Sequence, residues 1–153
     1  LISGDDRAND VFGHSVSLDE ALAIVGAHGD DDRGKRSGSA TIFKRTGRGW
    51  AREKKLVALD GGATDFFGIS VSISGSRAFV GAHGNGQKGT RSGAAYLFKR
   101  IGKGWVQEAR LVAGDAEKHD NFGRAVAIGG NYMISGSHGD DDKGTWSGSA
   151  YVY

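Results

Sequence analysis

The chain has 153 residues, among them 27 glycines, no proline and no cysteine, and its formal net charge is +2. This small, scattered charge gives no basic surface typical of nucleic-acid binding, and the lack of cysteine excludes disulfides. No apolar run approaches the roughly 18 residues of a membrane-spanning helix, so we expect neither a nucleic-acid partner nor membrane insertion. Because glycine adopts positive φ without steric cost, this composition favours a sheet protein with many tight turns.

A repeat with a period of 55 residues organises the sequence. A Phe-Gly pair occurs at residues 12–13, 67–68 and 122–123. A Gly-Ala-His-Gly motif, with Ser for Ala in its last occurrence, stands at residues 26–29, 81–84 and 136–139. We therefore expect one domain over residues 1–153 built of three copies, 1–55, 56–110 and 111–153, the last of which is incomplete.

Each copy is expected to form four short antiparallel strands, as its second occurrence shows. Residues 68–73 alternate Ile or Val with Ser, which is the period of a strand, and a Ser-Gly-Ser turn leads to a second strand at about 77–82. A glycine-rich loop precedes a third strand at about 94–100. A Gly-Lys-Gly turn precedes a fourth at about 105–112. No segment sustains the period of a helix.

Composition distinguishes the first strand from the fourth. Every other side chain of the first strand is small, which suits a strand crowded near an axis: Ser15, Ser17, Ser70, Ser72, Ala125 and Ala127. The fourth strand is rich in charge, which suits an outer edge. We interpret the aspartates that one residue separates from each Phe-Gly, Asp10, Asp65 and Asp120, as acceptors of backbone N–H groups in a turn. The phenylalanines are expected to wedge between neighbouring sheets.

Four-stranded units in series are typical of β-propeller blades. The motifs Asp-x-Phe-Gly, Val-Gly-Ala-x-Gly-Asp-Asp-Asp and Ser-Gly-Ser-Ala-Tyr make the whole chain resemble the FG-GAP repeat, the blade unit of the integrin alpha-subunit propeller and of bacterial surface proteins. The resemblance implies an all-β fold of propeller blades. Two features depart from the family. His28, His83 and His138 stand where proline is common, and the turns between first and second strands lack the calcium cage found in integrins.

Two acidic loops are candidate cation sites. Asp30 and Asp32, and in the third copy Asp140 and Asp142, cluster carboxylates beside glycine in a way that suits a hard cation such as Ca²⁺. The second copy has Asn85-Gly86-Gln87 instead, so the loop folds without a full acidic set. The alternative is a solvated turn whose charges pair with nearby Lys and Arg.

Aromatic and imidazole side chains give two further hypotheses. The three histidines could bind a transition metal or respond to pH, whereas a histidine that ends a strand more commonly bonds a neighbouring carbonyl. Trp50 and Trp105 are repeat-equivalent and are expected to pack. Trp146 replaces Arg36 and Arg91 of the other copies, and as a loop tryptophan it is the candidate contact for a ligand or partner.

No catalytic motif is recognisable, so we expect a protein that is not an enzyme. The resemblance implies a binding or adhesion module, extracellular or on the cell surface, that presents loops to a protein or glycan. Two alternatives remain open: an accessory propeller domain of a larger enzyme, and a structural building block of a surface assembly. Because propellers contain about 4–8 blades, three blades imply either part of a longer propeller chain or closure through a homo-oligomer.

Overall fold

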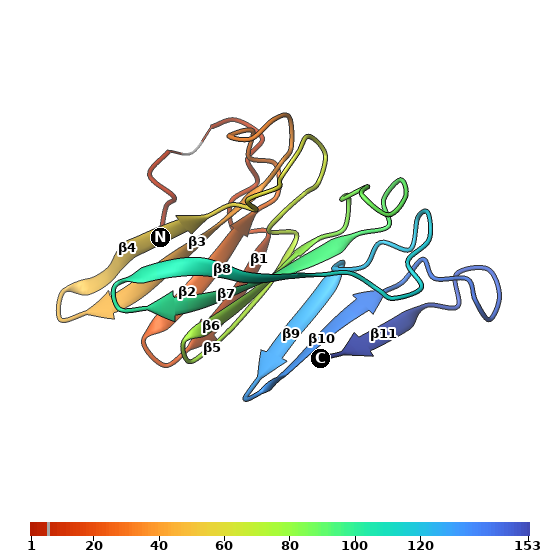
Figure 1. The fold of residues 1–153 in the computed structure, drawn as a ribbon. Coiled ribbons are helices and arrows are strands. Elements are labelled where there is room, and N and C mark those ends of the chain that lie inside the picture. The colour runs from red at the N-terminus through yellow and green to blue at the C-terminus, as the bar shows by residue number, and fades with distance from the viewer. Residues whose placement is uncertain (6) are drawn as a thin grey trace.

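The computed structural model describes residues 1–5 and 7–153, and in these ranges eleven strands form three antiparallel sheets without any helix (Figure 1). The first sheet contains β1 (Ser15–Asp19), β2 (Leu22–Ala27), β3 (Ser39–Thr46) and β4 (Gly49–Leu56). The second contains β5 (Ser70–Ser74), β6 (Arg77–Ala82), β7 (Ala94–Ile101) and β8 (Gly104–Leu111). The third contains β9 (Ala125–Gly129), β10 (Tyr132–Ser137) and β11 (Ser149–Val152). With no helix in the described ranges, none is available to cross a membrane.

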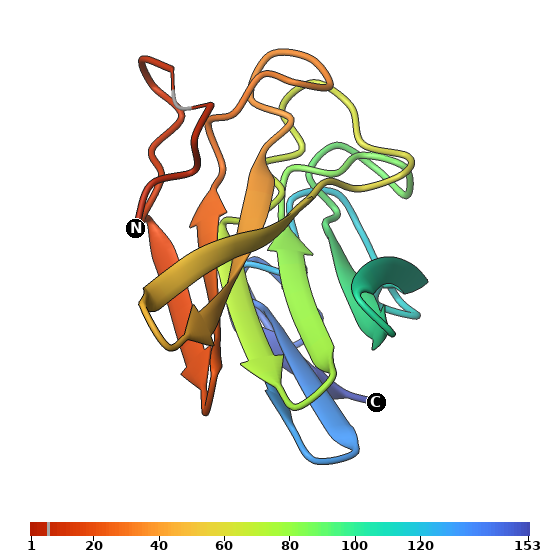
Figure 2. The same ribbon diagram turned by 90° about the vertical axis from the view of Figure 1, so that its left-hand side faces the viewer.

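The sheets lie side by side as propeller blades, with the second sheet between the first and the third (Figures 1 and 2). Their first strands contact one another in series, since β1 packs beside β5 and β5 beside β9. The strands of each sheet follow in chain order from this inner strand outward. The expected all-β architecture, the repeat of 55 residues and the incomplete third copy are therefore confirmed.

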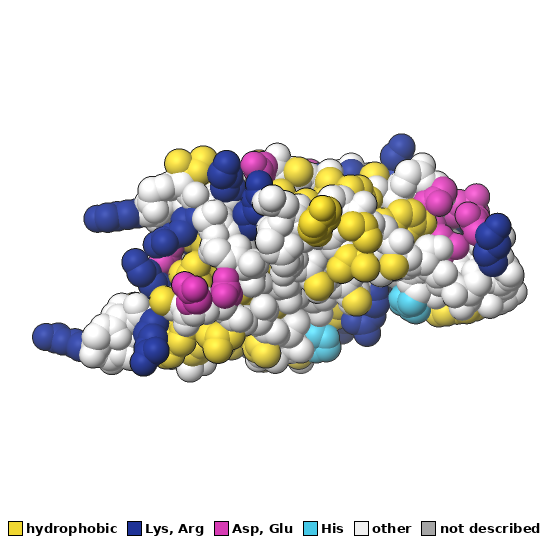
Figure 3. Space-filling view, turned by 90° about the horizontal axis from the view of Figure 1, so that it is seen from below, with side chains coloured by type: hydrophobic (Ala, Val, Ile, Leu, Met, Phe, Trp, Pro, Cys, Tyr) yellow, Lys and Arg dark blue, Asp and Glu magenta, His cyan; other side chains and the backbone are white. Residues whose placement is uncertain are grey.

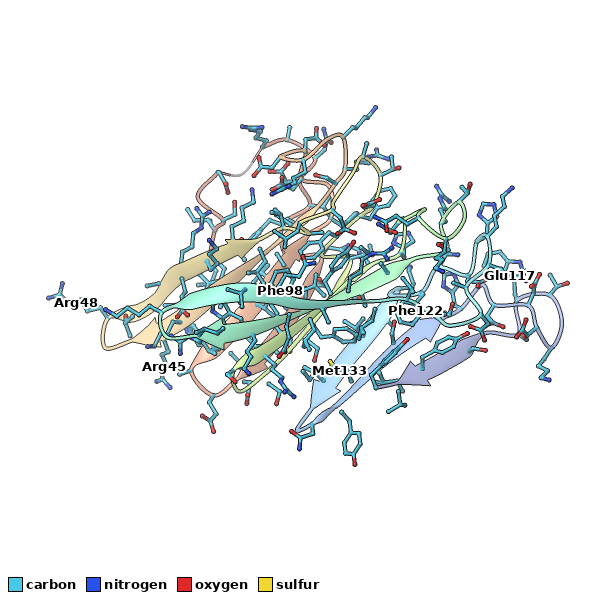
Figure 4. All side chains as sticks on the ribbon, viewed as in Figure 1. Arg45, Arg48, Phe98, Glu117, Phe122 and Met133 are labelled. Atoms are coloured by element: carbon cyan, nitrogen blue, oxygen red, sulfur yellow. The ribbon has the colours of Figure 1, made fainter. Side chains whose placement is uncertain are left out.

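Two apolar layers fill the spaces between the sheets. Between the first and second sheets, Ile24 and Ile42 pack with Val80 and Phe67. Between the second and third, Phe122 packs with buried side chains of the second sheet and with Met133, as Figure 4 shows. Phe67 and Phe122 are thus the wedges that the sequence predicts, with 1% and 0% of their surface exposed.

Serines of the inner strands tie neighbouring sheets together. The Ser15 hydroxyl donates to the Gly68 carbonyl at 2.8 Å, and Ser70 repeats this bond to Gly123 at 2.8 Å. The hydroxyl oxygens of Ser17 and Ser72 accept backbone N–H groups of the next sheet. The small alternating residues therefore serve both close approach and hydrogen bonding, which only the packed structure shows.

Two glycine motifs meet at each junction between sheets. A Cβ placed on Gly26 would lie 2.0 Å from the Gly68 carbonyl oxygen, and one on Gly81 would lie 1.9 Å from that of Gly123. Since no real Cβ tolerates such a distance, the Phe-Gly and Gly-Ala-His-Gly motifs form the two halves of one backbone contact. Their joint recurrence in the sequence reflects this contact.

The loop between the second and third strands of each sheet also supports the following sheet. The Lys35 carbonyl accepts the Thr64 N–H at 2.8 Å, and the Arg36 carbonyl accepts that of Phe66 at 3.1 Å. The second loop binds the third sheet in the same way through Thr90, Arg91 and Ser92. On the other side of the contact, Asp10, Asp65 and Asp120 each accept a backbone N–H three residues earlier, at 2.7, 2.9 and 2.6 Å, which confirms their predicted turn role.

Candidate functional site

The acidic loop of the first sheet surrounds a lysine ammonium. Lys55, near the end of β4, places its Nζ 2.6 Å from Asp30 Oδ2, 2.6 Å from Asp32 Oδ2 and 3.0 Å from Asp5 Oδ2. Asp30 is buried and also accepts the Ser39 hydroxyl at 2.9 Å. Burial alone would lower the pKa of Lys55, but the three carboxylates raise it well above its usual value. Both predicted metal ligands of this loop therefore lie around a cation that the chain itself supplies.

The second sheet has amides at the equivalent loop positions. Arg110, which corresponds to Lys55, donates from Nη2 to Asn85 Oδ1 at 2.7 Å and lies 3.2 Å from Asp60. Gln87 donates to the same Asp60 carboxylate at 3.0 Å. Asp60 therefore pairs with Arg110, and amides stand where the first loop has its acidic side chains; Asn85 also donates to Asp65 at 3.2 Å.

The third sheet repeats the acidic set of the first. One carboxylate oxygen each of Asp115, Asp140 and Asp142 lies within 4.8 Å of the others. The Tyr151 hydroxyl donates to Asp115 at 2.7 Å and to Asp140 at 3.0 Å, and burial together with these carboxylates raises its pKa. Among the described residues no lysine or arginine forms an ion pair with this set. Figure 3 shows acidic side chains gathered at the end of the molecule that carries these loops.

The third loop therefore offers the better arrangement for a hard cation, since it presents three carboxylates together and no lysine or arginine of the described residues pairs with them. The predicted pair Asp140 and Asp142 is brought together as expected. Asp115 was missed as a member of this set, although its equivalents at residues 5 and 60 follow the same period. Its position in another loop, 25 residues before Asp140, gave no local signal.

Trp146 lies on the exposed part of the third loop. Its side chain is 66% exposed and its ring lies 5.6 Å from that of His138, at an interplanar angle of 50°. The equivalent residues Arg36 and Arg91 are also exposed, even though their carbonyls bond to the next sheet. At this loop position the side chain is exposed in all three copies, including the two whose loops contact the next sheet.

The tryptophans at the start of the outer strands differ in burial. Trp105 is 6% exposed and donates from Nε1 to Glu53 at 3.0 Å, which confirms packing. Trp50 is 38% exposed, so the packing expected for it is only partial.

At Nδ1, His28 and His83 do not form the carbonyl bond that we expected. Nδ1 of His28 and Nδ1 of His83 are buried without a hydrogen-bond partner among the described residues. Instead, the His83 ring stacks on the Phe66 ring with centroids 5.2 Å apart. Burial, with the positive charges of Arg124 and Arg91 nearby, lowers the pKa of His83 to about 4. Stacking of the neutral imidazole thus replaces the expected carbonyl contact.

Comparison with known proteins agrees with this geometry. The family model of the FG-GAP repeat matches residues 1–43, 50–98 and 105–153. The chain belongs to the FG-GAP repeat family. No curated protein matches the sequence. The FG-GAP matches are offset from the sheets, because the second begins within β4 and ends within β7. One family repeat therefore joins the outer strand of one blade to the first three strands of the next.

Proposed function

We propose that this chain is a non-catalytic binding module that uses Trp146 to contact a ligand outside the cell or on its surface. The observation that supports this most strongly is the exposed indole, on a loop whose equivalents keep their side chains outward at both internal junctions. A large aromatic ring exposed on one side is typical of recognition surfaces. The extracellular location follows from the resemblance to surface propellers.

We propose a glycan as the ligand class. The open indole face suits stacking against a sugar ring, and the exposed carboxylate of Asp142 on the same loop is a hydrogen-bond acceptor for hydroxyl groups. A protein ligand is the other class that the resemblance implies.

The experiment compares three proteins on an array of glycans. The unmodified chain should bind a subset, Trp146→Ala should bind at least about tenfold more weakly, and Trp50→Ala, which removes an exposed tryptophan elsewhere, should bind as the unmodified chain does. Absence of binding to every glycan by the unmodified chain would overturn the glycan assignment. Equal loss in both variants would overturn the role of Trp146.

A further inference from the structure

A groove of about 410 Å³ lies between the outer strands of the first two sheets, β4 and β8. Both walls belong to sheets in which all four strands of the repeat are present, and the residues that line the groove fall between positions 33 and 107. Its floor is apolar and is formed by three buried side chains, Leu56, Phe98 and Trp105. Three exposed residues line its rim: Arg33, Lys54 and Leu59. We call this surface the β4–β8 groove.

Leu59 places an apolar side chain at the rim on a backbone that is held from both walls. The residue is 67% exposed. Its N–H donates to Gln107 Oε1 of the second sheet at 3.0 Å, and its carbonyl accepts Arg33 Nη1 of the first sheet at 3.3 Å. The equivalent residues of the other two copies are Gly4 and Gly114, so the repeat itself needs no side chain at this position. The exposed leucine is therefore a feature of this groove and not of the fold.

Two cations at the rim have no counter-charge. Neither Arg33 nor Lys54 forms an ion pair within the part of the chain that the structure describes. Glu53, the acidic residue of β4, already accepts hydrogen bonds from Arg100 and Trp105. The groove therefore combines an apolar floor with uncompensated positive charge, which complements a ligand that is both acidic and apolar.

The arrangement of the groove favours a peptide over a fatty acid. Its two cations come from separate segments, the loop after β2 and the strand β4, so they match a ligand with more than one carboxylate. In an extended peptide, successive side chains point to opposite sides, so an apolar residue can enter the groove while acidic neighbours reach its rim. In addition, β4 and β8 are the last strands of their sheets, and a sheet edge of this kind can pair with an extended peptide.

We propose that the β4–β8 groove binds an acidic peptide segment of a partner protein. An aliphatic residue of this segment packs beside Leu59, and the acidic residues that flank it pair with Arg33 and Lys54. The site is separate from the loop that carries Trp146, so it does not depend on the glycan proposed above.

Fluorescence polarisation of a labelled peptide with the core Glu-Leu-Glu-Leu-Glu tests the proposal. The unmodified chain should bind this peptide at low ionic strength, and binding should weaken as salt is added, because salt screens exposed ion pairs. A peptide with lysine for each glutamate and a peptide with serine for each leucine should not bind. Absence of binding to the acidic peptide at millimolar concentrations of the unmodified chain, or equal binding of the lysine peptide, would overturn the proposal.

Variants of the rim locate the binding site. Leu59→Gly introduces the residue of the other two copies and should weaken peptide binding about tenfold, because an apolar contact is lost. Lys54→Ala introduces the residue found at the equivalent position of β8, Ala109, and should weaken binding about threefold. Lys88→Ala, at the second-loop equivalent of Arg33, is the matched control and should bind as the unmodified chain does. Circular dichroism and thermal unfolding check that each variant folds. Unchanged binding by both rim variants would overturn the assignment to this groove.

Two further measurements separate this site from other ligands and from the proposed glycan site. Binding of sodium decanoate that is lost in Leu59→Gly, without binding of the acidic peptide, would replace the peptide by a fatty acid and overturn the proposal. Trp146→Ala should bind the peptide as the unmodified chain does, whatever its effect on glycan binding. Loss of peptide binding in Trp146→Ala would contradict a site in the β4–β8 groove.

Discussion

The ammonium nitrogen of Lys55 lies 2.6 Å from Asp30 Oδ2, and both side chains are almost fully enclosed, with 11% and 6% of their surface exposed. The lysine comes from the outer strand β4 and the aspartate from the loop after β2. This ion pair joins the outer strand of the first sheet to its acidic loop.

Lys55→Met should destabilise the fold, because it leaves Asp30 buried without its counter-charge. We expect a loss of about 3 kcal/mol in the free energy of unfolding, at the low end of the cost of breaking a buried pair because Asp5 and Asp32 are partly solvated. Urea unfolding at neutral pH measures it. Lys54→Met, the neighbouring exposed lysine, is the matched control, and equal losses in the two variants would contradict the role of the pair.

Calcium should act at the third acidic loop and not at the first. The carboxylates of Asp115, Asp140 and Asp142 face one another, whereas those of the first loop already surround Lys55. Millimolar calcium should raise the midpoint of thermal unfolding by a few degrees, since a ligand that binds only the folded state stabilises it. The shift should disappear in Asp142→Asn and persist in Asp32→Asn. No shift in the unmodified chain would rule out the site.

Glu53 should connect the outer strands of the first two sheets. It accepts two hydrogen bonds from Arg100, at 2.8 and 3.1 Å, and one from Trp105 at 3.0 Å. Glu53→Gln should cost about 1–2 kcal/mol of stability, because a bidentate, charge-assisted contact becomes neutral and mismatched. The repeat-equivalent Glu108→Gln should cost almost nothing, since Glu108 lies 3.9 Å from an exposed Lys99. Equal midpoints of denaturant unfolding for the two variants would contradict the role of Glu53.

His83 should make the fold acid-sensitive between about pH 6.5 and 4. Its pKa falls from an ordinary 6.5 to about 4, so over this interval the unfolded chain binds more protons than the folded one. Stability is then fully present above pH 6.5 and is lost as the pH falls toward 4, on the order of 1 kcal/mol after allowing for partial exposure.

The variant His83→Phe keeps the stacking on Phe66 and removes the titration, so its stability should change less over this interval than that of the unmodified chain. Denaturant titrations at several pH values measure the difference. His119→Gln, at an exposed histidine, is the control and should retain the full dependence. An unchanged pH slope in His83→Phe would exclude His83 as its source.

Much of the fold was predictable because its determinants recur locally. Alternation of Ile and Val with Ser marks the inner strands, and the predicted second-copy strands differ from β5 to β8 by two residues or fewer at their ends. The candidate site was predictable only in part. Asp140 and Asp142 share one loop, so their proximity follows from the sequence alone. Asp115 and Tyr151 join them only through the packing of separate segments.

The repeat, the four-strand unit and the family follow from the sequence alone, because each depends on residues near one another along the chain or on an exact period. The tertiary structure establishes which acidic loop holds a lysine and which carbonyls support the next sheet. These relationships join residues about 25 to 55 positions apart. A local sequence pattern cannot predict such contacts, because they form only when the packing of the sheets brings distant segments together.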